Sequence, residues 1–439
     1  MREQRTALSL FLILFSLFIS IPGIGVVKAT TNVTGVISSD TTWTKANSPY
    51  SLTGNTLIAN GVTLTIESGV TVNLKDYYIM VNGTLHAQGS GTEKMHFNGG
   101  EITFTEYSSD WDEQTGSGCI IENANLDSTI VDIGSVSPKI TNNSILRISF
   151  AYPAIISHNI IHNGITYSGA SGTLSYNTIS GGLKLTASAP VVSNNTISGG
   201  IYVSGGSPTI SYNTISGEVD VSGGRISSDF PVISYNRITG EEYGISCNGY
   251  AVISCNNISG CNSAIQLYPI QVLGGTSPAY PLIERNVITH NTRGITIVLS
   301  SRFDPGTLTP TIQNNTIAYN SVGIYVYITN YDSSPIIIYN NIHDNSDYNI
   351  QLDEETKDNI NAAYNWWGSN DVSAINQTIY DFKYDFNLGT VNFIPFLTEP
   401  NPEIPEFPYW TPLLITLVAL VAIAVVYRHK LNKHNQRRL

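Results

Sequence analysis

The sequence predicts an all-β protein built as a parallel β-helix, a solenoid in which each coil of chain lies on the one before it. The first indication is a repeated phrase, LSYNTISGGL from Leu174, VSNNTISGGI from Val192 and ISYNTISGEV from Ile210, with its central asparagines 18 residues apart. The second is a series of short runs of alternating apolar and polar residues, bounded by Gly, Ser, Pro or Asn, with almost no helical pattern. The third is the period, which starts at 16 and 18 residues and later ranges from 20 to 30. A repeat of this length indicates a solenoid.

The repeated asparagines have a structural explanation. Coils of a parallel β-helix lie about 4.8 Å apart, so equivalent residues form columns and each asparagine amide can bond its neighbours. Asparagine also tolerates the left-handed backbone that a tight corner needs. We therefore interpret these residues as a ladder rather than a metal or sugar site. The ladder is predicted at Asn159, Asn177, Asn195, Asn213, Asn236, Asn256, Asn286, Asn315 and Asn341, with comparable residues at Asn143 and Asn365. An inward apolar column is predicted at Ile179, Ile197, Ile215, Ile238, Ile258, Ile288 and Ile317.

The handedness of the coil follows less directly from the pattern. A left-handed β-helix also uses 18-residue coils, whereas later coils of 20–30 residues fit a right-handed one. The phrases NVITHNTRGITI and NTIAYNSVGIYV resemble the right-handed β-helix repeats of the pectate-lyase-like superfold, in the branch that includes the copper-site maturation protein NosD. This resemblance spans residues 120–368 and implies a right-handed β-helix, but it implies no particular chemistry, and no copper function is carried over.

Two flanks complete the predicted solenoid. Residues 30–119 alternate apolar and polar residues with glycine turns and resemble the N-terminal β segment that precedes many β-helices. Trp366 and Trp367 end the repeats, and an open solenoid end needs a cap, so a cap is favoured over a sugar site there. Residues 369–400 are predicted to be irregular, with strand character near 390–396.

The two ends of the chain predict targeting segments. Residues 1–29 have the basic start, apolar run and small-residue stop of a secretory signal peptide. Residues 410–427 carry no charge and reach about 27 Å as a helix, enough to cross a bilayer, and the basic tail 428–439 predicts a cytoplasmic end. A buried core helix is the alternative, but it leaves the basic tail unexplained. Residues 401–409 are proline-rich and predict an extended spacer.

The sequence Ile404-Pro405-Glu406-Phe407-Pro408, followed by an apolar span and a basic tail, resembles the PEF-type C-terminal sorting signal of archaeal surface proteins. That resemblance implies an archaeosortase as a processing partner. Retention as an unprocessed membrane anchor is the alternative.

Charge and composition favour a location outside the cell. Residues 30–427 keep 13 of the 21 basic and 32 of the 33 acidic residues, a net charge of −19, so nucleic-acid binding is excluded. The four cysteines, Cys119, Cys247, Cys255 and Cys261, permit at most one local disulfide in an oxidising compartment, and their spacing does not predict a metal site. N-glycosylation is predicted at Asn32, Asn82, Asn142, Asn194, Asn257, Asn314 and Asn376.

The catalytic equipment of pectate lyases and galacturonases is missing from the repeats. They contain no Asp-Asp, no Gly-His-Gly and no Arg-x-Lys, and no acidic residue occurs from Ile133 to Gly217. One acidic pair remains, Glu218 and Asp220. Carboxylates at i and i+2 on a strand lie about 6.5–7 Å apart, which is within the range for an inverting glycosidase. A solvated outer face is the simpler interpretation of the same pair.

Aligning the coils on the ladder asparagine predicts an outward column at Thr166, Lys184, Tyr202, Asp220, Ser246, Gln266, Thr296, Tyr325 and Gln351. Within it, Lys184, Tyr202 and Tyr325 are the predicted binding residues. No cofactor is predicted. The acidic runs 110–113 and 353–355 are interpreted as solvated loops that could take up Ca²⁺, and His158, His162, His290 and His343 lack the spacing of zinc or copper ligands.

Three functions stay open at this point. The first is a non-catalytic β-helix protein anchored at the cell surface, which binds carbohydrate or envelope proteins or acts in adhesion. The second is a polysaccharide hydrolase or lyase that uses Glu218 and Asp220. The third is a rigid spacer of the cell envelope.

Overall fold

The computed structural model describes residues 29–169, 171–224, 230–269, 280–299, 309–329 and 335–404. The predicted signal peptide up to residue 28, the membrane span 410–427 and the basic tail 428–439 lie outside the described residues. No helix within the described ranges is long and apolar enough to span a membrane. The chain divides into two compact units, residues 1–184 and 185–439.

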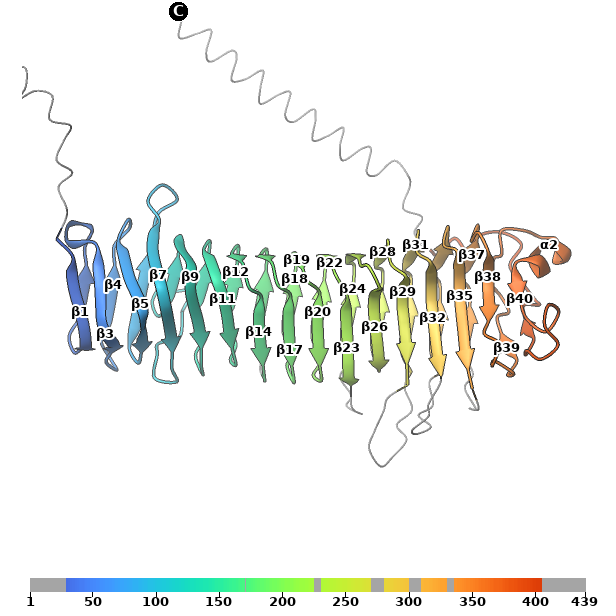
Figure 1. The fold of residues 1–439 in the computed structure, drawn as a ribbon, viewed down its shortest axis with the longest axis horizontal. Coiled ribbons are helices and arrows are strands. Elements are labelled where there is room, and N and C mark those ends of the chain that lie inside the picture. Colours follow the sequence, from blue (N-terminus) through green and yellow to red (C-terminus); the bar gives the residue numbers. More distant parts are fainter. Residues whose placement is uncertain are drawn as a thin grey trace, which may run out of the picture. The chain divides into compact units, whose positions relative to one another are not determined.

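Both units consist of parallel strands laid side by side, as Figure 1 shows, which confirms the predicted parallel β-helix. In the first unit, one sheet contains long strands that pair in order: β1 (Thr31–Ile37), β3 (Tyr50–Ile58), β5 (Thr71–Val81), β7 (Met95–Phe104), β9 (Ala124–Ile133) and β11 (Ser144–Phe150). The following coils divide this strand into two: β13 (Ile160–Ile161), β14 (Ile165–Ser168), β16 (Thr178–Ile179) and β17 (Leu183–Thr186). A second sheet contains β2 (Thr41–Trp43), β4 (Thr63–Ile66), β6 (Thr84–Gln88), β8 (Ile120–Glu122), β10 (Lys139–Thr141), β12 (Ile155–Ser157) and β15 (Thr173–Ser175).

Each coil of the second unit has three short strands separated by corners. The strands before the asparagine corner are β18 (Val191–Ser193), β21 (Thr209–Ser211), β24 (Val232–Ser234), β27 (Val252–Ser254), β30 (Leu282–Glu284), β33 (Thr311–Gln313) and β36 (Ile336–Ile338). Those after it are β19 (Thr196–Ser198), β22 (Thr214–Ser216), β25 (Arg237–Thr239), β28 (Asn257–Ser259), β31 (Val287–Thr289), β34 (Thr316–Ala318) and β37 (Asn341–His343). The third set is β20 (Ile201–Ser204), β23 (Val219–Gly224), β26 (Tyr243–Gly249), β29 (Ser263–Tyr268), β32 (Arg293–Leu299), β35 (Val322–Ile328), β38 (Tyr348–Leu352) and β40 (Ile379–Tyr380).

The core of the second unit is a column of isoleucines, as the repeat predicts. Ile215, Ile238 and Ile258 pair in register on β22, β25 and β28, and each has 0% of its surface exposed. Every isoleucine predicted for this column is fully buried. Burying one such side chain stabilises the fold by about 1.5–3 kcal/mol, so repetition over many coils supplies most of the hydrophobic stabilisation.

The asparagine column is a continuous hydrogen-bond ladder. Asn213 donates from both its backbone N–H and its Nδ2 to Oδ1 of Asn236, at 2.9 and 3.0 Å, and Asn236 repeats both bonds to Asn256. The same Nδ2 atoms also donate to main-chain carbonyl oxygens, as Asn236 does to Ile210 at 2.8 Å. Both functions of each buried amide are therefore satisfied.

Two details of the predicted ladder were wrong. Asn340, not Asn341, continues the column, because Asn340 Oδ1 accepts from Asn315 and its Nδ2 donates to Asn365. Asn341 instead begins β37, and its Oδ1 accepts from the backbone of Asn401 at 2.8 Å. The left-handed backbone also belongs to the residue before each ladder asparagine, for example Tyr212 with φ 58° and Tyr235 with φ 56°. The ladder position itself needs the amide, and the corner before it needs the positive φ.

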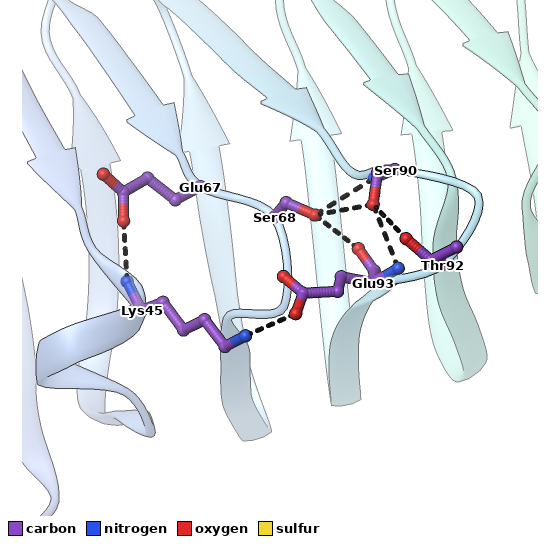
Figure 2. A network of polar contacts seen from close by, with 6 residues as sticks. All are labelled: Lys45, Glu67, Ser68, Ser90, Thr92 and Glu93. Carbon is purple, nitrogen blue, oxygen red and sulfur yellow. Dashed lines mark hydrogen bonds and ion pairs between the residues drawn. The ribbon is translucent and has the colours of Figure 1, made fainter.

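The first coils are closed differently, by a network of unlike side chains (Figure 2). Lys45, in the 3₁₀ turn η1 (Lys45–Asn47), binds Glu93 through Nζ at 2.7 Å and donates its backbone N–H to Glu67 at 2.8 Å. The backbone N–H of Ser90 donates to Ser68 Oγ, and the Ser90 hydroxyl oxygen accepts from the backbone N–H of Glu93. Ser90 therefore links the 67–70 turn to the 89–94 loop. We call these residues, 45, 67, 68, 90, 92 and 93, the polar clip.

The C-terminal end carries the remaining elements. Helix α2 (Val372–Gln377) begins at Asp371, whose side chain accepts from Ser373 N, and β41 (Val391–Asn392) pairs with β39 (Ile360–Asn361). Trp367 is 3% exposed and meets Phe393 edge to face, with ring centroids 6.1 Å apart. The start of the predicted extended spacer differs from expectation: Asn401 is bonded to Asn341 and Asn314, and Ile404 is buried.

Candidate functional site

The candidate site is the outer side of the third strand set in the second unit, which holds the predicted outward column. The strand register brings Tyr202, Asp220, Ser246, Gln266, Thr296, Tyr325 and Gln351 opposite one another on successive strands. Lys184 lies in the first unit, where it is exposed on β17 between two buried leucines. We call the seven residues of the second unit the outer row.

The outer row is not uniformly open to solvent. Tyr202 is 40% exposed and Asp220 is half-buried, but Ser246, Gln266 and Thr296 are buried at 8%, 6% and 1% exposed. The expectation of a solvated column was therefore wrong for its middle. Thr296 also has a buried partner, since its hydroxyl lies 2.9 Å from that of Ser263 on the neighbouring strand.

Glu218 lies in the turn before β23, directly before the apolar Val219. The main chain of Glu218 lies close to that of the preceding coil, since Ile201 donates its N–H to the Glu218 carbonyl oxygen at 2.8 Å. Gly200 makes this approach possible: its φ is +79°, and a Cβ there would lie 2.4 Å from the same oxygen. The position of Glu218 therefore depends on a glycine in the neighbouring coil.

Both carboxyl groups of the acidic pair hold protons more tightly than usual. Burial raises the pKa of Glu218, and the charges of Asp220 and Glu242 raise it further, while a hydrogen bond from Ser246 opposes the shift. Burial also raises the pKa of Asp220. The structure thus brings Glu218 and Asp220 together electrostatically, next to Ser246.

Sequence reasoning missed the aromatic members of this acidic group. The pKa of Tyr268 is raised, first by burial and then by a hydrogen bond with Tyr243 and the charges of Tyr243 and Glu218, while Gln266 opposes the shift. Tyr243 and Tyr268 lie on β26 and β29, beside members of the outer row. The repeat contained no signal for them, because both lie outside the aligned column.

A second polar group surrounds Tyr325 at the other end of the outer row. The Tyr325 hydroxyl donates to Asp353, and the guanidinium of Arg293 lies 3.9 Å from the centre of its ring. Burial, and then the hydrogen bond and charge of Asp353, raise the pKa of Tyr325 to about 12. Tyr327 donates to Glu355 at 3.0 Å. The run 353–355, predicted as a solvated loop, thus supplies acceptors to two tyrosines of β35.

The other acidic run, in the first unit, is tied to a turn. Asp112 Oδ1 accepts from the backbone of Gln114 at 2.8 Å, and Glu113 binds Lys139 at 2.6 Å. These contacts lower the pKa of both carboxyl groups. Over the described part of the chain, no three His, Cys, Asp or Glu residues are grouped so that they could hold a metal ion.

The four cysteines are all free thiols, so the local disulfide that the spacing permits is not formed. Cys119, Cys247 and Cys261 are buried, and burial raises the pKa of the Cys247 thiol to about 12. Cys255 is half-buried at an asparagine corner, with φ 57°.

The predicted glycosylation sites differ in access. Asn32, Asn142 and Asn194 are exposed, whereas Asn82, Asn257, Asn314 and Asn376 are half-buried. Asn142, Asn194 and Asn314 occupy the corner before a ladder asparagine, with φ of 57°, 57° and 55°. Asn314 Oδ1 accepts from Asn401 at 3.0 Å. Asn376 lines a cavity of about 310 Å³ with Lys383 and Phe393, and Lys383 binds its Oδ1.

Comparison with known proteins gives the fold and no activity. No curated protein matches the chain. A solved structure, that of a mutant of the periplasmic alginate epimerase AlgG, aligns with 13% identity over 80% of this chain and 75% of that chain, at a TM-score of 0.25. A score this low is not a basis for transferring any property. The family described as "Right handed beta helix region" matches residues 163–327 and 200–379. This match agrees with the right-handed coil predicted from the repeats.

Proposed function

We propose that this chain is a non-catalytic β-helix protein that is displayed at the cell surface and binds carbohydrate of the cell envelope. The observation that carries the proposal is the outer row, in which polar and aromatic side chains from seven successive strands lie in register. The accessible positions lie toward its two ends, Tyr202 and Asp220 at one and Tyr325 and Gln351 at the other, and the hydroxyl groups of an extended polymer can form hydrogen bonds with these polar side chains. Tyr202 at one end and Tyr325 near the other add aromatic rings suited to stacking on sugars.

The surface location in this proposal rests on the sequence. The signal peptide 1–29, the anchor 410–427 and the net charge of −19 over residues 30–427 support export and attachment. Processing by an archaeosortase and glycosylation at the seven sequons belong to the same proposal. The same negative charge argues against nucleic acid as a partner, because a nucleic-acid binder carries the opposite sign.

Binding is tested with the full chain on an array of immobilised neutral, acidic and amino-sugar polysaccharides. We expect retention on at least one glycan class, and at least a tenfold weaker affinity for a Tyr202→Ala, Tyr325→Ala double variant. Tyr107→Ala is the matched control, since Tyr107 is 57% exposed and belongs to the first unit, which holds no residue of the outer row. Equal affinity of all three proteins would exclude the outer row as the binding surface. No retention on any glycan would leave the spacer function.

One observation favours an enzyme as the second candidate. Glu218 and Asp220 both have a raised pKa, and a general acid for glycoside cleavage needs a carboxyl group that keeps its proton. We would incubate the same glycans with the full chain, with Ca²⁺ or with chelator, and measure new reducing ends and unsaturated products. Product that disappears in Glu218→Gln and in Asp220→Asn would establish hydrolysis by this pair. Product that persists in both variants would remove the pair from consideration.

A further inference from the structure

The outer row continues into the C-terminal end of the second unit, beyond the last repeat. Tyr380 on β40 pairs in register with Gln351 on β38, so it occupies the next position of the row (Figure 1). The Tyr380 ring stacks on that of Tyr384, with ring centroids 5.5 Å apart and an interplanar angle of 23°. Tyr348 contacts both rings, since its ring centroid lies 5.3 Å from that of Tyr380 and 6.1 Å from that of Tyr384. We call Tyr348, Tyr380 and Tyr384 the tyrosine cluster.

A buried carboxyl group holds the turn that carries Tyr384. Asp381 is 0% exposed, and its side chain accepts from the backbone N–H groups of Lys383 at 3.1 Å and Val391 at 3.0 Å. The Asp381 carbonyl oxygen accepts from the Tyr384 N–H at 2.8 Å, and the Tyr384 hydroxyl donates to the Gln377 carbonyl oxygen at 3.3 Å. The ring is therefore held in place before a ligand arrives, which lowers the entropic cost of binding.

The tyrosine cluster lies at the accessible end of the row. Tyr384 is 50% exposed, and Tyr348, Tyr380 and Gln351 are half-buried. A tyrosine ring has an apolar face and a polar hydroxyl group. These match the two sides of a sugar, whose C–H groups can stack on the ring while its hydroxyl groups bind polar neighbours such as the Gln351 amide.

Negative charge surrounds this end of the row. Residues 353–355 supply three carboxyl groups, and that of Asp353 accepts from the Tyr325 hydroxyl. Asp347, which directly precedes Tyr348, is exposed. The guanidinium of Arg293 is engaged on the Tyr325 ring. A polymer with a carboxylate on each sugar would meet like charges here, which disfavours its binding.

We propose that the tyrosine cluster is the stacking site for a neutral polysaccharide, which extends from Tyr384 along Gln351 toward Tyr325. This inference rests on the proposed function, because it names the glycan class and the residues that hold the glycan. The tyrosine rings supply the stacking contacts, and the row supplies hydrogen bonds. The carboxyl groups beside them select against anionic chains.

Calorimetric titration of the full chain with a neutral β-glucan, a neutral mannan and polygalacturonate tests the proposal. We expect binding of at least one neutral polymer and none of polygalacturonate. The affinity should persist at 1 M salt, where the screening length falls to about 3 Å, because stacking does not depend on charge. Tyr384→Asn should weaken binding by about two- to tenfold, as the loss of one aromatic contact predicts. Tyr384→Leu should weaken it equally and Tyr384→Phe should not, since stacking needs the flat ring.

Tyr212→Asn is the matched control, because Tyr212 is 58% exposed at an asparagine corner and its φ of 58° suits asparagine. Urea unfolding identifies a variant that fails to fold, and Tyr384→Leu, which keeps an apolar side chain against Tyr380, decides if Tyr384→Asn is destabilised.

Equal affinity of wild type, Tyr384→Asn and Tyr384→Leu would overturn this inference and leave the proposed function standing. Binding of polygalacturonate alone, or binding that disappears at 1 M salt, would also overturn it, because either result would indicate a charged ligand. Full affinity in Tyr384→Leu with a loss in Tyr384→Asn would overturn it as well, since an apolar contact without a ring fits a lipid surface. No binding of any glycan would overturn the proposed function and this inference together.

Discussion

The first coils and the coils of the second unit close the corners of the solenoid in two different ways. Around residues 45–93 the corners are joined by the polar clip, in which an exposed lysine, two glutamates and three hydroxyl residues each make different contacts (Figure 2). In the second unit a column of buried asparagines makes the same bonds again and again, and Asn291, Asn320 and Asn345 add a second such column in the later coils. The clip needs a specific set of partners, whereas the ladder needs only that each coil repeats the one before it.

The largest predicted effect breaks the ladder. Asn236→Ala removes the side-chain bonds that link Asn236 to Asn213, Asn256 and the carbonyls of Ile210 and Ser234. It leaves buried donors and acceptors without partners, which costs about 3–5 kcal/mol. Urea unfolding followed by circular dichroism measures the loss. Ser216→Ala, at an exposed position of β22, is the control and should change the unfolding free energy by less than about 0.5 kcal/mol. Equal behaviour of the two variants would contradict the ladder's role.

The next effect concerns a close backbone approach in the first coils. A Cβ at Gly83 would lie 2.2 Å from the carbonyl oxygen of Val62 and 2.3 Å from that of Ala59. Because both neighbours are main-chain atoms, the strands themselves must move, and we expect Gly83→Ala to cost about 1–3 kcal/mol. Gly61→Ala is an informative partner, since a Cβ there meets nothing within 4 Å although the φ of +75° is unfavourable. If Gly83→Ala lowered the free energy of unfolding less than Gly61→Ala does, the close approach of Gly83 to the carbonyl oxygens of Val62 and Ala59 would not restrict this position.

The polar clip itself should matter less than one rung of the ladder. The Lys45–Glu93 pair is 56% and 51% exposed, so solvent screens it and Lys45→Ala should cost only about 0–1 kcal/mol. High salt should reduce the difference between wild type and variant, because the screening length falls to about 3 Å at 1 M. The same unfolding experiment with and without salt tests this. If Lys45→Ala lowered the free energy of unfolding as much as Asn236→Ala does, the polar clip would matter as much to stability as one rung of the ladder.

The smallest effect is a pH dependence at the acidic pair. The pKa of Glu218 is raised in the folded state, so folding binds a proton there and stability falls as pH rises from the usual pKa of 4.5 through the raised one. Glu218→Gln removes this penalty, so the variant should be more stable than wild type at pH 7, by no more than about 0.5 kcal/mol after allowance for solvent screening. The difference should vanish below pH 4.5. Thermal unfolding across this range measures it, with Glu284→Gln as the control, and a variant less stable at pH 7 would contradict the shift.

The sequence by itself determined the repeating parts of the second unit. The asparagine recurs in every coil, and an isoleucine follows it by two residues in all but the last, where Trp367 follows Asn365. A parallel stack must place such residues in columns, so the ladder and the apolar core could be predicted without coordinates. The one misplaced rung, Asn341, lies in a doubled asparagine. The isoleucine rule would have resolved it, because Ile342 follows Asn340 by two residues, whereas His343 follows Asn341.

Only the tertiary structure decided the parts that depend on contacts between unlike coils. Ser246, Gln266 and Thr296 are buried although the repeat places them in an outward column. The contacts of Asp353 with Tyr325 and of Asp127 with His162 join residues 28 and 35 positions apart. Loops of varying length separate these pairs, and their register is fixed by strand pairing. A periodic sequence specifies what repeats, whereas the chemistry of a site arises where the repeat is broken, and the neighbours of such positions are known only once the coils are stacked.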